Sequence, residues 1–239
     1  MKFGFFILTW CMHLAIHAQL VTSTPENSSK TKNGEHSSLI YMDFQQMTTS
    51  PKLSQNTDFL TIPLGERANE QALKSWSYQF GMCTPLSKHL IIDGGLAFIQ
   101  NGEQYTWTSN STDSSFAYQT KYRYFGMPIQ LKFETGKDVS FFVGAGLSPQ
   151  LFQSYQQDIQ WKDSLGNASK LTLNDEKMCE TFVLSALAST GINVHFKSNY
   201  GLRLSLYYRY QLTNAYGPYQ YFKYFSSGIG GGIALTRRL

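Results

Sequence analysis

Charged residues are scarce in this sequence, and their scarcity narrows the classes of protein to which it can belong. Asp, Glu, Lys and Arg together make up 15% of the 239 residues, against roughly 25% in ordinary soluble domains. The formal net charge is +4, and the basic residues are scattered along the chain. A nucleic-acid-binding surface needs a basic patch or stripe, so we expect no nucleic acid among the partners.

Cysteine and histidine are also rare, with three Cys and five His in the chain. No CxxC, HExxH or paired Cys/His cluster is present, so we predict no metal site, no cofactor and no catalytic residue. We expect Cys83 inside the protein near a short turn and Cys179 beside a long loop. A disulfide requires Cα atoms within about 7 Å, so we predict that these two thiols are not joined.

Long apolar runs are missing beyond the first residues. The apolar run from Phe3 to Ile16 follows the basic Lys2 and ends at a plausible cleavage site before Gln19, so residues 1–18 are predicted to be a signal peptide. Residues 19–38 are polar and predict a flexible leader. No later stretch approaches the roughly 20 apolar residues of a spanning helix. If the chain crosses a membrane, strands must do it.

Aromatic residues and glycine are what the sequence has in quantity, and this composition favours pleated sheet. Eight runs with strand-like alternation are expected at residues 39–46, 75–84, 89–100, 116–134, 139–155, 178–196, 201–212 and 222–238. The connections after the first run alternate between long and short. The pattern predicts an all-β fold, an eight-stranded antiparallel up-and-down transmembrane β-barrel over residues 39–239. Such barrels have short periplasmic turns and longer extracellular loops.

The two faces of these runs indicate which side of the barrel meets lipid. Large apolar residues occupy one face, whereas the other carries mainly Gly, Ser and uncharged polar residues. A soluble barrel would bury the apolar face and expose charges, whereas small and polar residues suit the crowded interior of an eight-stranded wall. The predicted lipid-facing residues are Phe125, Met127, Ile129, Leu131, Phe133, Phe141, Val143, Leu204 and Leu206.

The other face supplies a predicted polar network inside the barrel. Its members are Asp43, Asp93, Gln130, Lys132, Asn193, Arg203 and Arg209, with Gln79 and His195 nearby. Because an unpaired buried charge is costly, we expect both acids to pair with basic residues across the lumen. The network is interpreted as structural filling, and no open pore is expected.

The segment YRYFGMPIQLKFETGKDVSFFVGAGLSPQLF, residues 122–152, resembles the outer-membrane β-barrel proteins of Bacteroidetes, a group that includes the PorT-like barrels. The match lies in Tyr122, Tyr124 and Pro128 of a Y-x-Y…P element and in the Ala145-Gly146 ending. The segments LRLSLYYRYQLT and YFSSGIGGGIAL are similar to the family's last two strands, so the resemblance covers residues 76–239. It implies insertion into the outer membrane by the assembly machinery, but no single activity.

The function that we predict is a non-enzymatic structural, binding or secretion-accessory role in the outer membrane. The expected partners are outer-membrane lipid, the assembly machinery and an envelope or secretion protein. A lipid-modifying enzyme is the first alternative, but it needs a nucleophile and a base near the outer rim. Of His36, His89 and His195, two are expected near the periplasmic end. A soluble lipocalin-like ligand-binding barrel is the second alternative.

Overall fold

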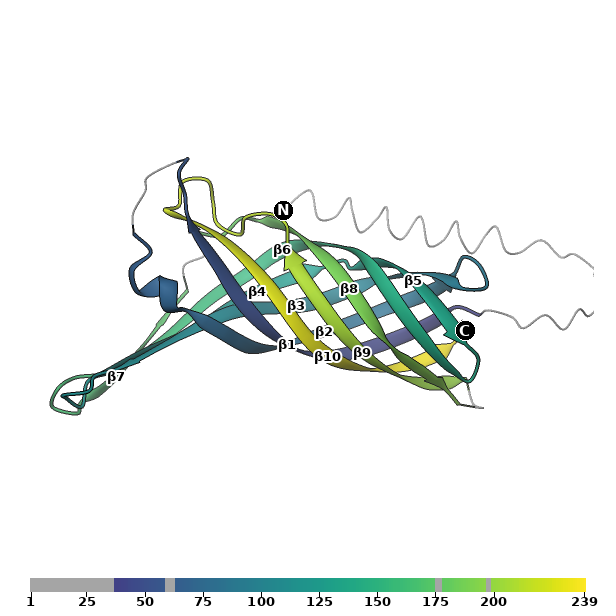
Figure 1. The fold of residues 1–239 in the computed structure, drawn as a ribbon, viewed down its shortest axis with the longest axis horizontal. Coiled ribbons are helices and arrows are strands. Elements are labelled where there is room, and N and C mark those ends of the chain that lie inside the picture. The colour runs from purple at the N-terminus through teal and green to yellow at the C-terminus, as the bar shows by residue number, and fades with distance from the viewer. Residues whose placement is uncertain (1–36, 59–62, 175–177, 197–198) are drawn as a thin grey trace, which may run out of the picture. The chain divides into compact units, whose positions relative to one another are not determined.

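Antiparallel strands account for most of the described chain (Figure 1). The structure, a computed structural model, describes residues 37–58, 63–174, 178–196 and 199–239. The predicted signal peptide and residues 19–36 of the predicted leader lie outside these ranges. The elements are β1 (Leu39–Gln55), the 3-10 helix η1 (Gly65–Asn69), β2 (Gln71–Pro85), β3 (Leu90–Thr108), β4 (Ser115–Gly126), β5 (Ile129–Gly136), β6 (Val139–Lys162), β7 (Ala168–Leu173), β8 (Phe182–His195), β9 (Tyr200–Gln211) and β10 (Phe222–Arg238).

Eight strand positions form a closed ring, as predicted. Each pairs antiparallel with its neighbours, and β1 pairs with β10 from Leu39↔Arg238 to Gln55↔Phe222. One ring position is shared by β4 and β5, which both pair with β3 and β6. The predicted strand 116–134 is therefore interrupted at residues 127–128. Pro128 has no N–H to donate, but its carbonyl accepts from Gly95 N at 3.1 Å, which keeps the sheet connected across the interruption.

Several strands are longer than the sequence pattern predicted. β1 continues to Gln55, β3 to Thr108 and β6 to Lys162, while β7 lies in a segment expected to be irregular. The connection between β3 and β4 is consequently only residues 109–114, not the long loop expected after Gln100. The predicted loops were wrong here because polar residues alternating with aromatic ones extend the ladder as well as aliphatic ones do.

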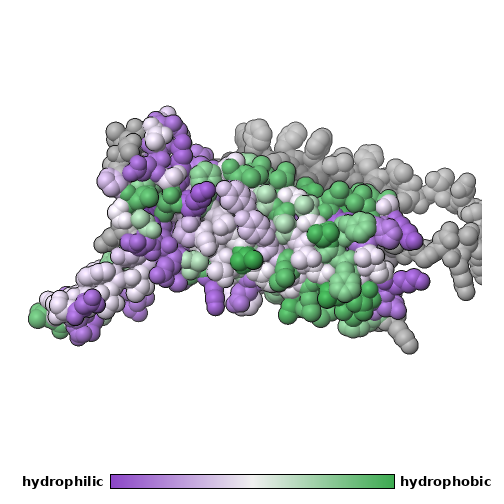
Figure 2. Space-filling model, viewed as in Figure 1, coloured by the Kyte–Doolittle hydropathy of each residue, from purple (hydrophilic) through white to green (hydrophobic). Residues whose placement is uncertain are grey.

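The barrel is apolar outside and polar inside. Its largest fully buried side chains include Arg203, Lys132 and Glu103, whereas Phe141 is 59% exposed and Leu206 64% exposed. Figure 2 shows hydrophobic side chains over the wall and hydrophilic ones toward its two ends. This distribution contradicts the soluble lipocalin-like alternative, because water would have to solvate the apolar outer wall. In a membrane that wall meets hydrocarbon, and ring closure satisfies the backbone.

The two ends of the barrel differ in the length of their connections. The turn end carries the short connections at residues 86–89, 137–138 and 196–199, and the loop end carries the others. The apolar belt is the zone of outward apolar residues between them. Its members nearest the loop end are Phe44, Trp76, Phe98, Phe125, Leu151, Phe182, Leu212 and Ile229.

Candidate functional site

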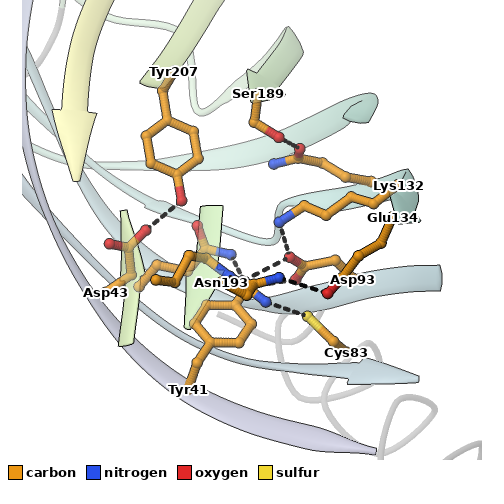
Figure 3. Close-up of polar contacts among 12 residues, drawn as sticks. Tyr41, Asp43, Cys83, Asp93, Lys132, Glu134, Ser189, Asn193 and Tyr207 are labelled. Atoms are coloured by element: carbon orange, nitrogen blue, oxygen red, sulfur yellow. Dashed lines mark hydrogen bonds and ion pairs between the residues drawn. The ribbon is translucent and has the colours of Figure 1, made fainter. Parts of the chain in front are cut away.

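The lumen contains a compact charge cluster toward the turn end, which we call the turn-end cluster: Tyr41, Cys83, Asp93, Lys132 and Arg203. Figure 3 labels Tyr41, Cys83, Asp93 and Lys132 of this cluster. Asp93, on β3, forms ion pairs with Lys132 of β5 and, at 3.5 Å, with Arg203 of β9. Tyr41 donates to the same carboxylate at 2.5 Å. All three charges are almost fully buried, so the low-dielectric interior makes their pairing obligatory.

Further side chains hold the cations of this cluster in place. The Arg203 guanidinium donates to Asn193 Oδ1 at 2.7 Å and to Cys83 Sγ at 3.1 Å. Its carbon lies 4.8 Å from the Tyr41 ring centroid. Asn193 in turn donates to Glu134 at 2.9 Å. The period-two pattern places these residues on inward faces, and ring closure then brings β2, β3, β5, β8 and β9 together around them.

Asp43 and Arg209 differ from what we expected. Asp43 accepts from Tyr207 at 2.6 Å and from Gln45 at 2.8 Å, but it makes no ion pair with any described residue. Arg209 likewise donates to Asn101 at 2.7 Å and faces no described acid within salt-bridge distance. The prediction that both acids pair with bases was thus wrong for Asp43. One neutral amide and one phenol solvate it instead.

The middle of the lumen is filled by polar side chains. Ser189 donates to Gln130 at 2.6 Å. A cavity of about 20 Å³ lies beside Gln130, Ser148 and Arg209, which is room for about one water molecule. Ser148 Oγ is buried without a hydrogen-bond partner among the described residues, so a water in this cavity would satisfy it. The geometry is that of a packed interior.

A second cluster lies beyond the apolar belt, and we call it the loop-end cluster. It comprises Arg67, Glu70, Glu103, Tyr118, Tyr122, Tyr216 and Tyr224. Glu103 accepts from Tyr122 and from Tyr224, both at 2.9 Å. Tyr122 and Tyr216 hydroxyls are 2.7 Å apart. Tyrosine hydroxyls thus stabilise the buried carboxylate here, whereas cations stabilise it in the turn-end cluster.

The segment with η1 covers this cluster. Arg67, in the last turn of η1, pairs with Glu70 at 2.9 Å and donates to Tyr216 at 2.9 Å. Tyr118 donates to Glu70 at 2.8 Å, so the segment is fixed to β4 as well as to the β9–β10 connection. The Glu70 side chain is 1% exposed, which means that two carboxylates, Glu70 and Glu103, are buried near a single cation.

Burial and its neighbours perturb the acid–base chemistry of the loop-end cluster. Burial first, and then the nearby Glu70 carboxylate, raise the pKa of Glu103 from 4.5 to about 8. Burial and the hydrogen bond to Glu70 also raise the pKa of Tyr118. Glu103 lies five residues beyond Phe98 on β3, opposite Thr120, where the outward neighbours Gln100 and Lys121 are polar. Its environment is therefore protein and not lipid.

Four strands continue past the belt as a free-standing sheet, which we call the fin: residues 104–108 of β3, 115–121 of β4, 156–162 of β6, and β7. The strand order is β3-β4-β6-β7, and Figure 1 shows its β7 end extending away from the ring. The register places like residues on like faces. One face carries Tyr105, Trp107, Phe116, Tyr118, Ile159, Trp161 and Leu171, and the other carries Gln104, Thr106, Ala117, Gln119, Asp158, Gln160, Lys170 and Thr172.

The structure places the sequence-predicted residues as follows. On the outer wall, exposed, are Phe125, Ile129, Leu131, Phe133, Phe141, Val143, Leu204 and Leu206. Met127 is half-buried at the interruption between β4 and β5. Buried in the lumen are Asp43, Asp93, Gln130, Lys132, Asn193, Arg203 and Arg209. Within this second set, Asp93, Lys132, Asn193 and Arg203 lie together, while Asp43 and Arg209 are separate from them.

The loop-end cluster was missed in the sequence. Glu103, Tyr105 and Trp107 alternate with Gln104 and Thr106, which is a period-two signal inside a segment interpreted as a loop. Arg67 lies in η1 and Tyr216 in the connection between β9 and β10, and neither segment carries such a signal. Only the tertiary fold brings them to Glu103.

The described residues hold no metal-ligand cluster of three or more His, Cys, Asp or Glu side chains. No described helix is long and apolar enough to cross a bilayer. Cys83 and Cys179 form no disulfide with each other, as predicted. His89 and His195 both lie at the turn end, close to residues 134–138.

Comparison with solved structures gives matches across most of the chain. Neisserial surface protein A is 12% identical, covers 83% of this chain and 96% of its own, and has a TM-score of 0.43. Ail, the attachment invasion locus protein of Yersinia pestis, is 12% identical over 82% and 97%, with a TM-score of 0.31. The N-terminal β-barrel domain of Pseudomonas aeruginosa OprF is 10% identical over 82% and 96%, with a TM-score of 0.35.

These neighbours are outer-membrane β-barrel proteins. The likeness is one of fold. No protein-family model matches the sequence, and no curated protein matches it either.

Proposed function

We propose that this chain is a non-enzymatic outer-membrane β-barrel protein of the PorT-like, Bacteroidetes type that presents the fin outside the cell as a binding surface for an envelope or secretion protein. The assembly machinery inserts it after export, outer-membrane lipid surrounds the apolar belt, and the packed lumen serves as structural filling. The observation that carries the proposal is the two-faced fin beyond the belt.

The aromatic face of the fin has the chemistry of a protein-binding surface. Trp107 is 47% exposed and Trp161 40% exposed, and Trp is among the residues that contribute most to protein interfaces. Leu171 on β7 adds to the same face. Monomeric proteins rarely leave contiguous apolar patches of this kind exposed without a function. A solvent-exposed hairpin without a binding role would be expected to have two polar faces.

Topology is tested first, with epitope tags at opposite ends of the barrel. One tag is inserted at Leu165 in the fin, which is 86% exposed, and the matched tag at Leu86 in a turn-end connection, which is 57% exposed. On intact cells we expect antibody to reach the Leu165 tag and to reach the Leu86 tag only after permeabilisation. Access to both tags, or to neither, on intact cells would contradict the proposed orientation.

Binding is tested with photo-crosslinking residues on the two faces of one strand. Trp107 and Thr106 are neighbours on β3 but face opposite sides. We expect a protein adduct from position 107 and none from position 106, and the same contrast between Trp161 and Gln160 on β6. Equal adducts from both faces, or no adduct from either, would show that the aromatic face is not the binding surface.

A further inference from the structure

A groove crosses the outer wall of the barrel where its surface should be smooth. It has a volume of about 750 Å³, and its lining is mostly apolar. Its lining residues include Trp76, Phe141, Leu206, Gly231 and Ile233, from four of the six strands that line it. The groove lies on the face formed by β1, β2, β10, β9, β8 and β6, which are consecutive around the ring.

The strand register shows how the groove arises. One row of paired outward residues runs Phe141, Ile192, Leu204, Ile233, Phe44. The next row toward the loop end runs Thr190, Leu206, Gly231, Gln46, Trp76. The second row lacks a side chain at Gly231, and the large residues around that gap form the walls.

Packing in the lumen does not explain Gly231. A Cβ at Gly230 would lie 2.0 Å from Gln46 O, and one at Gly232 would lie 2.8 Å from Asp43 Oδ1, so both inward glycines are required by close approach. A Cβ at Gly231 would meet nothing closer than Ser205 O at 3.6 Å. The wall would accept a side chain at this outward position, and its absence leaves the groove open to the surrounding lipid.

Cations lie at the loop-end side of the groove. Lys74 is the next outward residue after Trp76 on β2 and pairs in register with Thr48 of β1, while Lys52 follows farther along β1. Both lysines are exposed, and neither makes an ion pair with a described residue. No outward position of β1, β2, β9 or β10 is acidic. Trp76 marks the edge of the belt, where tryptophan is enriched at membrane interfaces.

We propose that this groove binds one acyl chain of an anionic, phosphate-bearing membrane lipid, whose headgroup is held by Lys74 and Lys52. Apolar area buried along the groove stabilises the chain, and each cation near the membrane surface attracts the phosphate. The inference rests on the proposed membrane location. The two lysines select the headgroup by its charge, and the gap at Gly231 selects the acyl chain by its shape. This combination distinguishes the groove from the rest of the wall.

Fluorescence quenching in vesicles tests the proposal. The full chain with Trp10, Trp107 and Trp161 replaced by Phe keeps Trp76, in the groove, as its only tryptophan. Vesicles of phosphatidylcholine contain a minority of a lipid with brominated chains, either phosphatidylglycerol or phosphatidylcholine. We expect brominated phosphatidylglycerol to quench Trp76 fluorescence at a lower membrane fraction than brominated phosphatidylcholine does. The ratio of the two fractions should be about fivefold for each lysine that contacts the headgroup.

Two variants separate headgroup from chain. Lys52→Gln with Lys74→Gln should reduce the preference to about one, since the attraction near the surface comes from these charges, whereas Lys88→Gln with Lys137→Gln at the turn end should leave it unchanged. Gly231→Leu should fill the groove and weaken quenching, whereas Gly94→Leu, at an outward glycine on β3 with no atom within 4 Å of its Cβ, should not.

The outcomes are distinct. The proposed site would be overturned if the single-tryptophan protein showed no preference for phosphatidylglycerol over phosphatidylcholine. It would also be overturned if that preference survived the removal of both lysines. The lysine variants keep the test valid even if Gly231→Leu fails to fold, and a heat-modifiable gel band monitors folding of each variant. Because the measurement uses vesicles, its failure differs from failure of the fin or of the cellular topology, which the tags and crosslinks report.

Discussion

A buried acid is stabilised at each end of the lumen, but by different chemistry. Toward the turn end, Asp93 lies between two cations, Lys132 and Arg203. Toward the loop end, Glu103 lies among hydroxyl groups, with Tyr122 and Tyr224 as its donors. A buried acid is tolerated in both places, but the first arrangement depends on full charges and the second on neutral donors.

The difference follows from position along the barrel. Inside the apolar belt the wall is apolar on its outer side, so the buried charges of Asp93, Lys132 and Arg203 have little access to water and stabilise one another, while Asp43 depends on hydrogen bonds from neutral groups. Beyond the belt, Glu103 can become neutral by taking up a proton, and hydroxyl groups serve either state because they both donate and accept. The turn-end cluster should therefore fail when a partner is removed, and the loop-end cluster when the pH is changed.

Removal of the Asp93 charge should have the largest effect. Asp93→Asn leaves Lys132 and Arg203 buried without a counterion, and breaking such a pair costs about 3–5 kcal/mol. We expect the urea midpoint of unfolding, followed by the heat-modifiable gel band, to fall strongly or the barrel to fail to assemble. Asp43→Asn, at an acid with no ion pair, is the matched control and should cost much less. Equal losses would mean that the two acids are held alike.

The pH dependence of the loop-end cluster should come next in size. The folded state keeps the Glu103 proton up to about pH 8, whereas an unfolded glutamate releases it near its ordinary pKa. The folded state then binds more protons between these values, so the free energy of unfolding falls as the pH rises through this window. At about 1.4 kcal/mol per pKa unit, the loss between pH 5 and pH 9 is on the order of 4 kcal/mol.

Glu103→Gln, a neutral isostere, should flatten this dependence between pH 5 and pH 9. Urea unfolding of parent and variant across that range measures it. Asp158→Asn is the control. The pKa of Asp158 is lowered by its hydrogen bond from Gln156, so it titrates below the window and its removal should leave the slope unchanged. A parent whose stability is level across the range would contradict the proposed titration of Glu103.

The smallest effect is expected at the contact between η1 and the cluster. Tyr216→Phe deletes the hydroxyl that meets Arg67 at 2.9 Å and Tyr122 at 2.7 Å, which should cost about 1 kcal/mol. We expect faster hydrogen exchange in residues 65–70, with little change in the global unfolding midpoint. Tyr208→Phe, on the exposed outer wall, should leave this exchange unaltered. Unchanged exchange in Tyr216→Phe would show that the hydroxyl does not hold the segment.

The contrast between the turn-end cluster and the loop-end cluster also explains which parts of the lumen the sequence could predict. Asp93, Lys132, Asn193 and Arg203 lie on strands with clean alternation, so their inward orientation followed from a period of two. The pairing expected of Asp43 failed, because alternation fixes the face of a residue and not its distance from charges elsewhere around the ring. The loop-end cluster could not be assembled, because Arg67 and Tyr216 take their places only through the tertiary contacts that they make.

The closure of the ring also has a consequence for assembly. β1 and β10 pair along their whole lengths, from Leu39↔Arg238 to Gln55↔Phe222, although nearly the whole barrel sequence separates them. Contacts of such high sequence separation form slowly, and until they form both strands present unpaired edges that can recruit other chains. The first strand of the ring to be synthesised is thus the last to be paired on both edges. An incomplete chain would remain an open, aggregation-prone sheet, so protection of these edges until the ring closes is a physical requirement of this topology.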